Sequence, residues 1–210
     1  MKNIRHNARY LVGIDEVGRG PIAGPVAVGA FIFLVDSNSL DGKAALRRHF
    51  RGVKESKQLS EAKREEWFAK ILEAQRLGLV DFAVTFMSEK VIDSKGLSFA
   101  IRTALEKSLR IVVSEASSVP EECTVLLDGG LKAPTDFIHQ ETIIKGDAKE
   151  AVIALASICA KVLRDRRMRL HAKKHPNYGF DIHKGYGTKA HYVAIRSHGM
   201  LPLHRKSFLN

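Results

Sequence analysis

The sequence predicts an α/β protein: a mixed five-stranded sheet with helices on both faces and a small basic helical appendage at the C-terminal end. The first two apolar segments are adjacent and separated by a glycine-rich turn, whereas the later ones alternate with helical segments. This order is typical of a mixed sheet covered by helices. With 210 residues, 45% of them hydrophobic, the chain is long enough for one domain with a full core.

The predicted strands are short apolar runs rich in β-branched and aromatic residues. The first two are almost continuously apolar, so we expect them at the centre of the sheet with both faces covered. The third alternates between apolar and polar residues, and the last two each end in an acid. The five segments are residues 9–15, 25–35, 79–87, 123–128 and 137–147.

The predicted helices have apolar residues at helical spacing. Ser60 has the side chain of an N-cap, and Gly78 is placed to end the helix that Ser60 begins. One long helix is expected over 148–175, apolar at first and then strongly basic. The other helices are expected over 97–116 and 188–199. We place the main domain at residues 1–167 and the basic C-terminal helical region, packed on it, at 168–210.

Positive charge is concentrated in the last third of the chain. The formal net charge is +11, and residues 145–210 hold 14 Lys or Arg against 4 Asp or Glu. Clustered positive charge favours a polyanion, most often the phosphate backbone of a nucleic acid. The alternative is a basic surface that only keeps the protein in solution.

The sequence also indicates a cytoplasmic protein with no membrane partner. Cys123 and Cys159 lie in apolar runs without metal-site spacing, which favours reduced, buried thiols. The first 15 residues lack the apolar core of a signal peptide. The longest apolar or small run, 151–160, is only about ten residues long, too short to span a bilayer.

Four acids lie at the ends of predicted strands: Asp15, Glu16, Asp128 and Asp147. If strand ends gather at one edge of the sheet, these carboxylates converge and repel one another unless a cation neutralises them. Carboxylate oxygens suit Mg²⁺ or Mn²⁺, and two such ions stabilise both the attacking and the leaving oxygens of a phosphoryl transfer. Singly, each acid has a simpler explanation: turn formers at Asp15, Glu16 and Asp128, and a helix N-cap at Asp147.

Gly18, Arg19 and Gly20 directly follow the first acid pair. Glycines let a backbone approach a ligand closely, and exposed N–H groups bind phosphate or sugar oxygens. A tight turn would also need glycine, so this motif gains weight only from the acids beside it.

Several motifs in a fixed order resemble those of bacterial ribonuclease HII. They are GIDEVGRGPIAGPV, SKQLS, LLDGG, IIKGDAK, LASICAKVLRDR, GFDIHKGYGTKAH and HRKSF, and they extend over residues 9–209. Gly-Arg-Gly at 18–20 favours this family over the related ribonuclease HIII. The resemblance implies a ribonuclease H-like fold and a monomeric enzyme. It also implies metal-dependent hydrolysis of RNA in RNA–DNA hybrids, and 5′ of single ribonucleotides embedded in duplex DNA, leaving 3′-hydroxyl and 5′-phosphate ends.

The same resemblance assigns roles to individual residues. It makes Asp15, Glu16, Asp128 and Asp147 the catalytic, metal-binding carboxylates. The remaining matched residues are expected to bind nucleic acid. Gly18, Arg19 and Gly20 would sense the 2′-hydroxyl, Tyr186 would pack on the following deoxyribose, and Lys57, Lys161 and Arg164 would contact phosphates.

Each of these assignments has a competing explanation. Tyr186 between two glycines is also what a packed turn would show, and the basic residues also fit a solvated helix face. For the whole protein, two other functions stay open. One is a different metal-dependent nuclease of the same fold, and the other is a hybrid-binding protein without catalysis.

Overall fold

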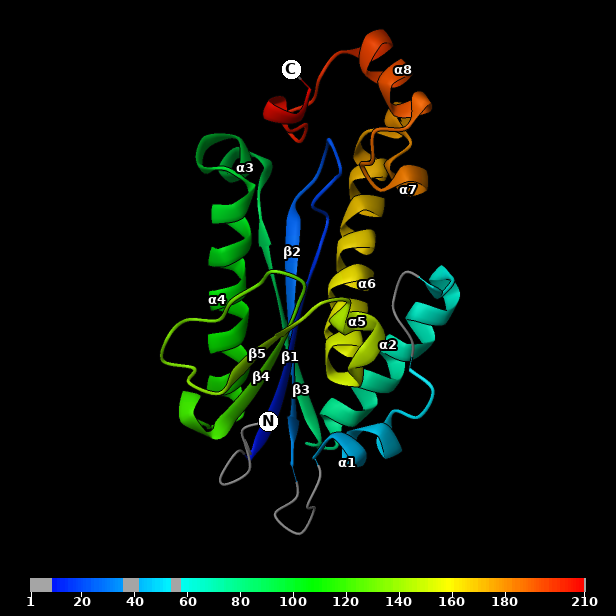
Figure 1. Cartoon of the computed structure of the whole chain (residues 1–210). Helices are drawn as coiled ribbons and strands as arrows, with labels where there is room; N and C mark the ends of the chain where they lie inside the picture. Colours follow the sequence, from blue (N-terminus) through cyan, green and yellow to red (C-terminus); the bar gives the residue numbers. More distant parts are fainter. Residues whose placement is uncertain (1–8, 36–41, 54–57, 210) are drawn as a thin grey trace.

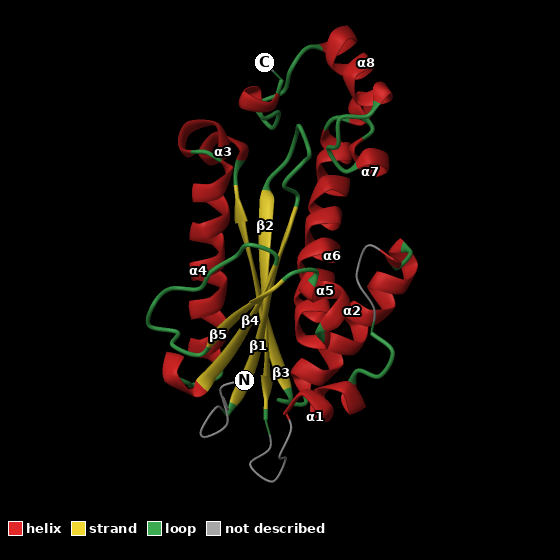
Figure 2. Cartoon of the chain, in the orientation of Figure 1, coloured by secondary structure: helices red, strands yellow, loops and turns green. Residues whose placement is uncertain are grey.

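The computed structural model describes residues 9–35, 42–53 and 58–209, and it contains one mixed sheet of five strands (Figures 1 and 2). The strand order is β3-β2-β1-β4-β5. Neighbours β1, β2 and β3 pair antiparallel, whereas β4 runs parallel to β1 and β5 parallel to β4. This confirms the predicted fold class. The strands are β1 Tyr10–Val17, β2 Val26–Leu34, β3 Val80–Met87, β4 Cys123–Asp128 and β5 Gln140–Ile143.

Helices cover both faces of the sheet (Figure 1). On one face lie α3 Glu89–Lys95 and α4 Leu97–Glu115. On the other lie α1 Gly42–His49, α2 Glu61–Arg76, α5 Gly146–Lys149 and α6 Ala151–Lys174. The C-terminal region adds α7 Phe180–His183 and α8 Lys189–His198, and short 3₁₀ turns occupy Pro120–Glu122, Pro176–Tyr178 and Lys206–Phe208. No helix among the described residues is both long enough and apolar enough to cross a membrane.

The helix signals in the sequence are confirmed in part. The Ser60 hydroxyl accepts a hydrogen bond from the Lys63 N–H at 3.2 Å, as an N-cap does. The long helix predicted over 148–175 is confirmed as α6, but its predicted start is wrong: α5 ends before Glu150 and α6 begins after it, with extended backbone at Glu150 itself (φ −118°, ψ 118°). The charged segment 36–52, for which no helix was predicted, contains α1 within its described part.

Two glycines let α6 pack closely on the sheet. A methyl group added at Gly13 of β1 would lie 2.3 Å from the Val152 carbonyl, and one at Gly29 of β2 would lie 2.4 Å from the Ala156 carbonyl. Only glycine fits at such distances. The apolar start of α6, which the sequence shows as small residues, therefore lies directly against the two central strands.

The C-terminal region is joined to the rest through its own apolar cluster. This cluster combines Ala23, from the β1–β2 loop, with Met168 of α6 and Phe180 of α7. The predicted division after residue 167 falls inside α6, which continues unbroken to Lys174. The division into a main domain and a C-terminal region stays a prediction.

Candidate active site

Asp15 and Asp128 lie on adjacent strands and on the same face of the sheet. Ile14 pairs with Leu127 in the parallel ladder, so Asp15 and Asp128 are one step further along neighbouring strands. Side chains alternate along a strand. Gly13, two residues before Asp15, faces α6, and Leu126, two residues before Asp128, is buried in the cluster on the α6 side. The two acids therefore share the α6 face at one end of the sheet.

The turn before α6 brings Asp147 to the same place. The Gly146 N–H donates to Asp128 Oδ1 at 2.6 Å, which fixes the chain at α5 next to the end of β4. Lys145 takes the left-handed conformation (φ 55°) to begin this turn. Asp147, which is buried, then lies close enough to raise the pKa of Asp15 by charge repulsion. The N-cap explanation of Asp147 does not hold, since Asp147 lies within α5 and Glu150 precedes α6.

Burial and neighbouring charge both oppose ionisation of Asp15. Its pKa is raised well above the ordinary value, first because the side chain is almost fully buried. A hydrogen bond from the Ser157 side chain works in the other direction, and the charges of Glu16, Asp128 and Asp147 add to the increase. Asp15 and Glu16 near the end of β1, Asp128 at the end of β4 and Asp147 of α5 therefore lie close enough to act on one another. The expectation that Asp147 ends a strand is wrong, because β5 ends at Ile143 and Asp147 lies within α5.

Glu16 forms an ion pair with Arg19, which lies between Gly18 and Gly20 in the loop. The Arg19 guanidinium donates to Glu16 Oε1 at 2.9 Å. Burial raises the pKa of Glu16, although the Arg19 hydrogen bond and charge lower it. The second oxygen, Oε2, is buried without a hydrogen-bond partner among the described residues. An unpartnered buried carboxylate oxygen lacks the compensation that burial normally requires.

The chemical type of these ligands, carboxylate oxygens, suits a hard divalent cation. The acids offer oxygen ligands only, and both the unpartnered oxygen of Glu16 and the raised pKa of Asp15 are conditions that a nearby cation would relieve. Within the described residues, however, no three Asp, Glu, His or Cys side chains are placed so that they could hold one ion together. The acids form a neighbouring group rather than a closed chelate, and their binding of metal stays a prediction.

The Gly18–Gly20 loop and Tyr186 lie next to each other. A methyl group on Gly20 would lie 3.8 Å from the Tyr186 ring. Tyr186 is 44% exposed, so this residue is open to a ligand. Gly18 has a φ of +93°, which favours glycine, and a methyl group there would lie 2.3 Å from Arg164 Nε. The structure thus brings together the loop and the aromatic residue that the motifs suggest for nucleic-acid binding.

The prediction that Arg164 contacts a phosphate is wrong. Its side chain is completely buried, and its guanidinium donates to the carbonyls of Pro25 at 2.9 Å and Lys184 at 3.1 Å. Arg164 therefore stabilises the β1–β2 loop from the protein interior through its hydrogen bond to Pro25. Lys161 is partly buried and donates to Asp165 at 2.7 Å. Lys57 lies outside the described residues.

Sequence reasoning missed three buried residues around the site, two of which contact it directly while His204 reaches it through His191. Ser157 lies inside the quoted LASICAK motif and hydrogen-bonds Asp15. His204 and Arg205 lie inside the HRKSF motif near the C-terminus, and both are buried. A serine in an apolar helix, or a His-Arg pair in a tail, could have drawn attention to these residues as buried polar groups. Their partners could not be predicted, because Asp15 and Gly18 lie more than a hundred residues away from Ser157 and Arg205 in the sequence.

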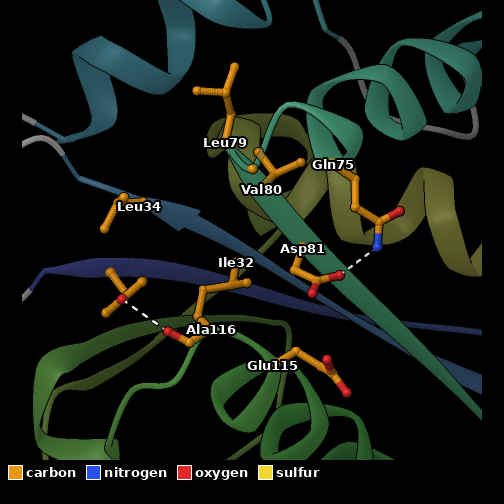
Figure 3. Close-up of a pocket in the computed structure, with 10 residues that line it drawn as sticks. Ile32, Leu34, Gln75, Leu79, Val80, Asp81, Glu115 and Ala116 are labelled. Carbon is orange, nitrogen blue, oxygen red and sulfur yellow. Dashed lines mark hydrogen bonds between the residues drawn. The ribbon is translucent and has the colours of Figure 1, made fainter.

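A separate pocket lies at the opposite end of β1 (Figure 3). Its lining includes Tyr10 at the start of β1 and Leu34 at the end of β2, and Gln75 donates to Asp81 at its wall at 2.6 Å. None of the four predicted catalytic acids lines this pocket. It is therefore distinct from the acid group.

Comparisons with known proteins agree with the motifs. The family model for ribonuclease HII matches residues 12–210. Ribonuclease HII of Bacillus cereus strain AH820 is 43% identical over 199 residues, covering 95% of this chain and 68% of the relative. A ribonuclease HII from Bacillus thuringiensis strain Al Hakam is equally similar, at 43% identity over the same shares.

Two solved structures share the fold. The ribonuclease HII in a complex with PCNA from Archaeoglobus fulgidus has a TM-score of 0.68 at 23% identity, covering 93% of each chain. Bst-RNase HIII in complex with Mn²⁺ has a TM-score of 0.63 at 21% identity, covering 92% of this chain and 64% of that one. The resemblance drawn from the motifs is confirmed, and the chain belongs to the ribonuclease HII family, whose members are endoribonucleases that hydrolyse RNA in RNA–DNA hybrids.

Proposed function

We propose that this protein cuts RNA–DNA hybrids, and duplex DNA 5′ of a single embedded ribonucleotide, with Asp15, Glu16, Asp128 and Asp147 as its catalytic carboxylates. The observation that carries the proposal is the placement of Asp15 and Asp128 on one face of adjacent strands, with Glu16 and Asp147 close by. Acids gathered in this way, next to a glycine loop and an exposed aromatic ring, suit phosphodiester hydrolysis.

The four carboxylates would hold Mg²⁺ or Mn²⁺. Ribonuclease HII enzymes depend on divalent metal ions. Such a pair of ions, when bound, supplies the positive charge that stabilises the attacking and leaving oxygens of phosphoryl transfer. The chain's own part is to concentrate carboxylates at one end of the sheet and to keep Asp15 in place through Ser157. Arg19 neutralises part of the charge on Glu16.

The neighbouring loop and ring would recognise the substrate. Backbone groups of Gly18, Arg19 and Gly20 are proposed to bind the 2′-hydroxyl, the group that separates RNA from DNA at a given sugar. Tyr186 would pack on the deoxyribose that follows, where a ribose would be crowded. Because Gly20 and the Tyr186 ring are adjacent, these two contacts would be made to consecutive sugars.

The direct test is Asp128→Asn. Asparagine keeps an oxygen that accepts from the Gly146 N–H, so the turn before α6 is preserved while the negative charge is lost. We expect incision of a duplex with one embedded ribonucleotide to fall by about a hundredfold or more, since several kcal/mol of charge stabilisation is at stake and each 1.36 kcal/mol is tenfold in rate. Incision at the wild-type rate with Mg²⁺ would refute the assignment.

Two controls separate the alternatives. An all-DNA duplex of the same sequence should stay intact, whereas a DNA nuclease of the same fold would cut it. A non-catalytic hybrid-binding protein would bind the hybrid and show no turnover with either Mg²⁺ or Mn²⁺. We further propose a monomer that acts in the cytoplasm, in keeping with two buried free cysteines.

A further inference from the structure

Two consecutive residues near the C-terminus reach the two parts of the proposed recognition site. We call residues 201–209 the tail. It lies next to the β1–β2 loop (Figure 1), where the Gly24 N–H donates to the Leu203 carbonyl at 2.9 Å and the Arg205 N–H donates to the Ile22 carbonyl at 2.8 Å. Inside this contact, His204 is 1% exposed and Arg205 is fully buried.

Arg205 binds the backbone of the glycine loop directly. Its guanidinium donates to the carbonyl of Gly18 at 2.7 Å, of Arg19 at 3.0 Å and of Gly24 at 2.9 Å. These three bonds join the start and the end of the β1–β2 loop. With the Gly18 and Arg19 carbonyls turned towards Arg205, the orientation of the peptide groups between Gly18 and Gly20 is set from the interior.

Burying the Arg205 guanidinium to stabilise a loop is energetically unfavourable by itself. Removing a charge from water is unfavourable unless hydrogen bonds compensate it, and an apolar side chain would avoid this desolvation. Burial lowers the pKa of Arg205 to about 10, with the positive charge of Arg164 adding to the effect. What the guanidinium offers, and an apolar side chain does not, is a planar set of donors that matches several carbonyls at once.

His204 reaches Tyr186 through a second histidine. The Leu201 N–H donates to His204 Nδ1 at 2.8 Å, closer than the Leu201 carbonyl at 3.2 Å, which leaves the proton of His204 on Nε2. His204 Nε2 then donates to His191 Nε2 at 3.1 Å. His191 in turn carries its proton on Nδ1, which donates to the Tyr186 carbonyl at 2.9 Å.

Packing holds the two imidazoles in this chain. The His183 ring stacks on the His191 ring with centroids 4.2 Å apart, and the Phe180 ring meets His191 edge-on. Burial lowers the pKa of His191 to about 4, so the neutral form that the chain of hydrogen bonds requires is the one present at neutral pH. The Tyr186 backbone is therefore tied to the tail by two hydrogen bonds in series, with His191 between them.

We propose that His204 and Arg205 are positioning residues that hold the Gly18–Gly20 loop and Tyr186 in one fixed geometry for ribonucleotide recognition. The inference rests on the proposed function. Because recognition of consecutive sugars needs both elements in register, loosening either one misplaces the substrate without removing any group that touches it. Small misplacements of this kind lower rates by up to about a hundredfold.

The experiment compares two substitutions of His204. Asparagine keeps an acceptor for the Leu201 N–H but cannot reach His191, whereas glutamine places a donor near the position of Nε2. Incision is measured on a single-ribonucleotide duplex and on a continuous RNA–DNA hybrid. For His204→Asn we expect the ratio of kcat/KM on the first to that on the second to fall about tenfold, because Tyr186 serves the junction with deoxyribose. His204→Gln should restore most of the ratio.

Arg205→Lys tests the other half of the tail. Lysine keeps the charge but lacks the planar fork needed for three carbonyls, so kcat per folded molecule should fall on both substrates, about tenfold or more. The exposed neighbour Lys206 provides the matched control, and Lys206→Ala should behave as wild type. Thermal unfolding of each variant gives its folded fraction.

The outcomes are separable. Loss of folded protein lowers activity on both substrates equally, so it cannot change the His204→Asn ratio. If that ratio stays at the wild-type value, or if folded Arg205→Lys retains wild-type kcat, the positioning role is wrong while the proposed function stands. If wild-type protein cuts neither substrate, the proposed function itself fails.

Discussion

Asp15 shows how a single residue carries a conflict between stability and proposed function. It is 3% exposed, and its pKa is raised by burial and by three neighbouring acids, against the hydrogen bond from Ser157. A carboxyl whose pKa is higher in the folded than in the unfolded chain favours folding below the unfolded value. That contribution is lost as the pH rises through the folded pKa.

We therefore expect Asp15→Asn to be more stable than wild type at pH 7 without metal. The advantage should shrink as the pH falls and vanish near the ordinary value of 3.8. Each kcal/mol gained would raise the melting temperature by roughly 2–4 °C in a chain of this size. The measurement is thermal unfolding between pH 4 and 8 with a chelator present.

Asp93→Asn is the matched control at this scale. Although partial burial opposes it, hydrogen bonds from Ser207 and Lys206 lower the pKa of Asp93, so the same chemical change should destabilise the protein at pH 7. Addition of Mn²⁺ should stabilise wild type more than Asp15→Asn. An Asp15→Asn variant less stable than wild type at pH 7 would contradict this account of Asp15.

At the scale of elements, the contact between α6 and the sheet decides where the acids meet. Its closeness depends on the absence of a side chain at Gly13 and Gly29. The same contact places Ser157 of α6 within hydrogen-bond reach of Asp15. Packing of a helix on a strand is thus coupled directly to the geometry of the site.

Gly29→Ala should accordingly destabilise the fold. The added methyl group would lie 2.4 Å from the Ala156 carbonyl, a backbone atom that cannot move without shifting α6. Overpacking of this kind costs about 1–3 kcal/mol. The measurement is the midpoint of urea unfolding. Gly130→Ala, where nothing lies within 4 Å of the added carbon, should stay within about 0.5 kcal/mol of wild type, and equal effects of the two changes would rule out the close packing.

At the scale of the whole molecule, only part of the excess positive charge is available to bind nucleic-acid phosphates, because some of the cations are paired or buried. The formal charge is +11, but Arg166 and Arg169 pair with Glu65 of α2, and Arg164 and Arg205 are buried. Exposed cations of the C-terminal region, such as Lys189 at the start of α8, remain available to nucleic-acid phosphates.

Binding to a hybrid duplex should therefore weaken with salt, and unequally among variants. Each lost phosphate contact reduces the slope of log K against log salt by about 0.9. In the Asp128→Asn background, which we expect to slow cutting, Lys189→Gln should reduce the magnitude of this slope by up to about 0.9. Arg166→Gln should change it less, because its charge already faces Glu65 at 2.5 Å. Equal changes would show that ion pairing does not decide which cations bind.

Much of the fold follows from local sequence patterns. The strand segments, the Ser60 cap and the acids near the ends of β1 and β4 depend on neighbours within a few residues. That Asp15 and Asp128 share one face depends in addition on the register between β1 and β4. The family motifs select the same four acids as candidate catalytic residues. Comparison with known proteins shows that the chain belongs to that family. These features are determined by composition and spacing, so the sequence by itself predicted the fold class, the family and the meeting of the acids.

Tertiary structure alone decided the roles that depend on distant contacts. The turn into α5 is fixed by the Gly146 N–H bound to Asp128, and the Arg164 side chain is held inside by the carbonyls of Pro25 and Lys184. Arg205 reaches Gly18 across 187 positions of the chain. Such contacts form between groups that no local pattern links, because a hydrogen bond depends on position in space and not on separation in sequence.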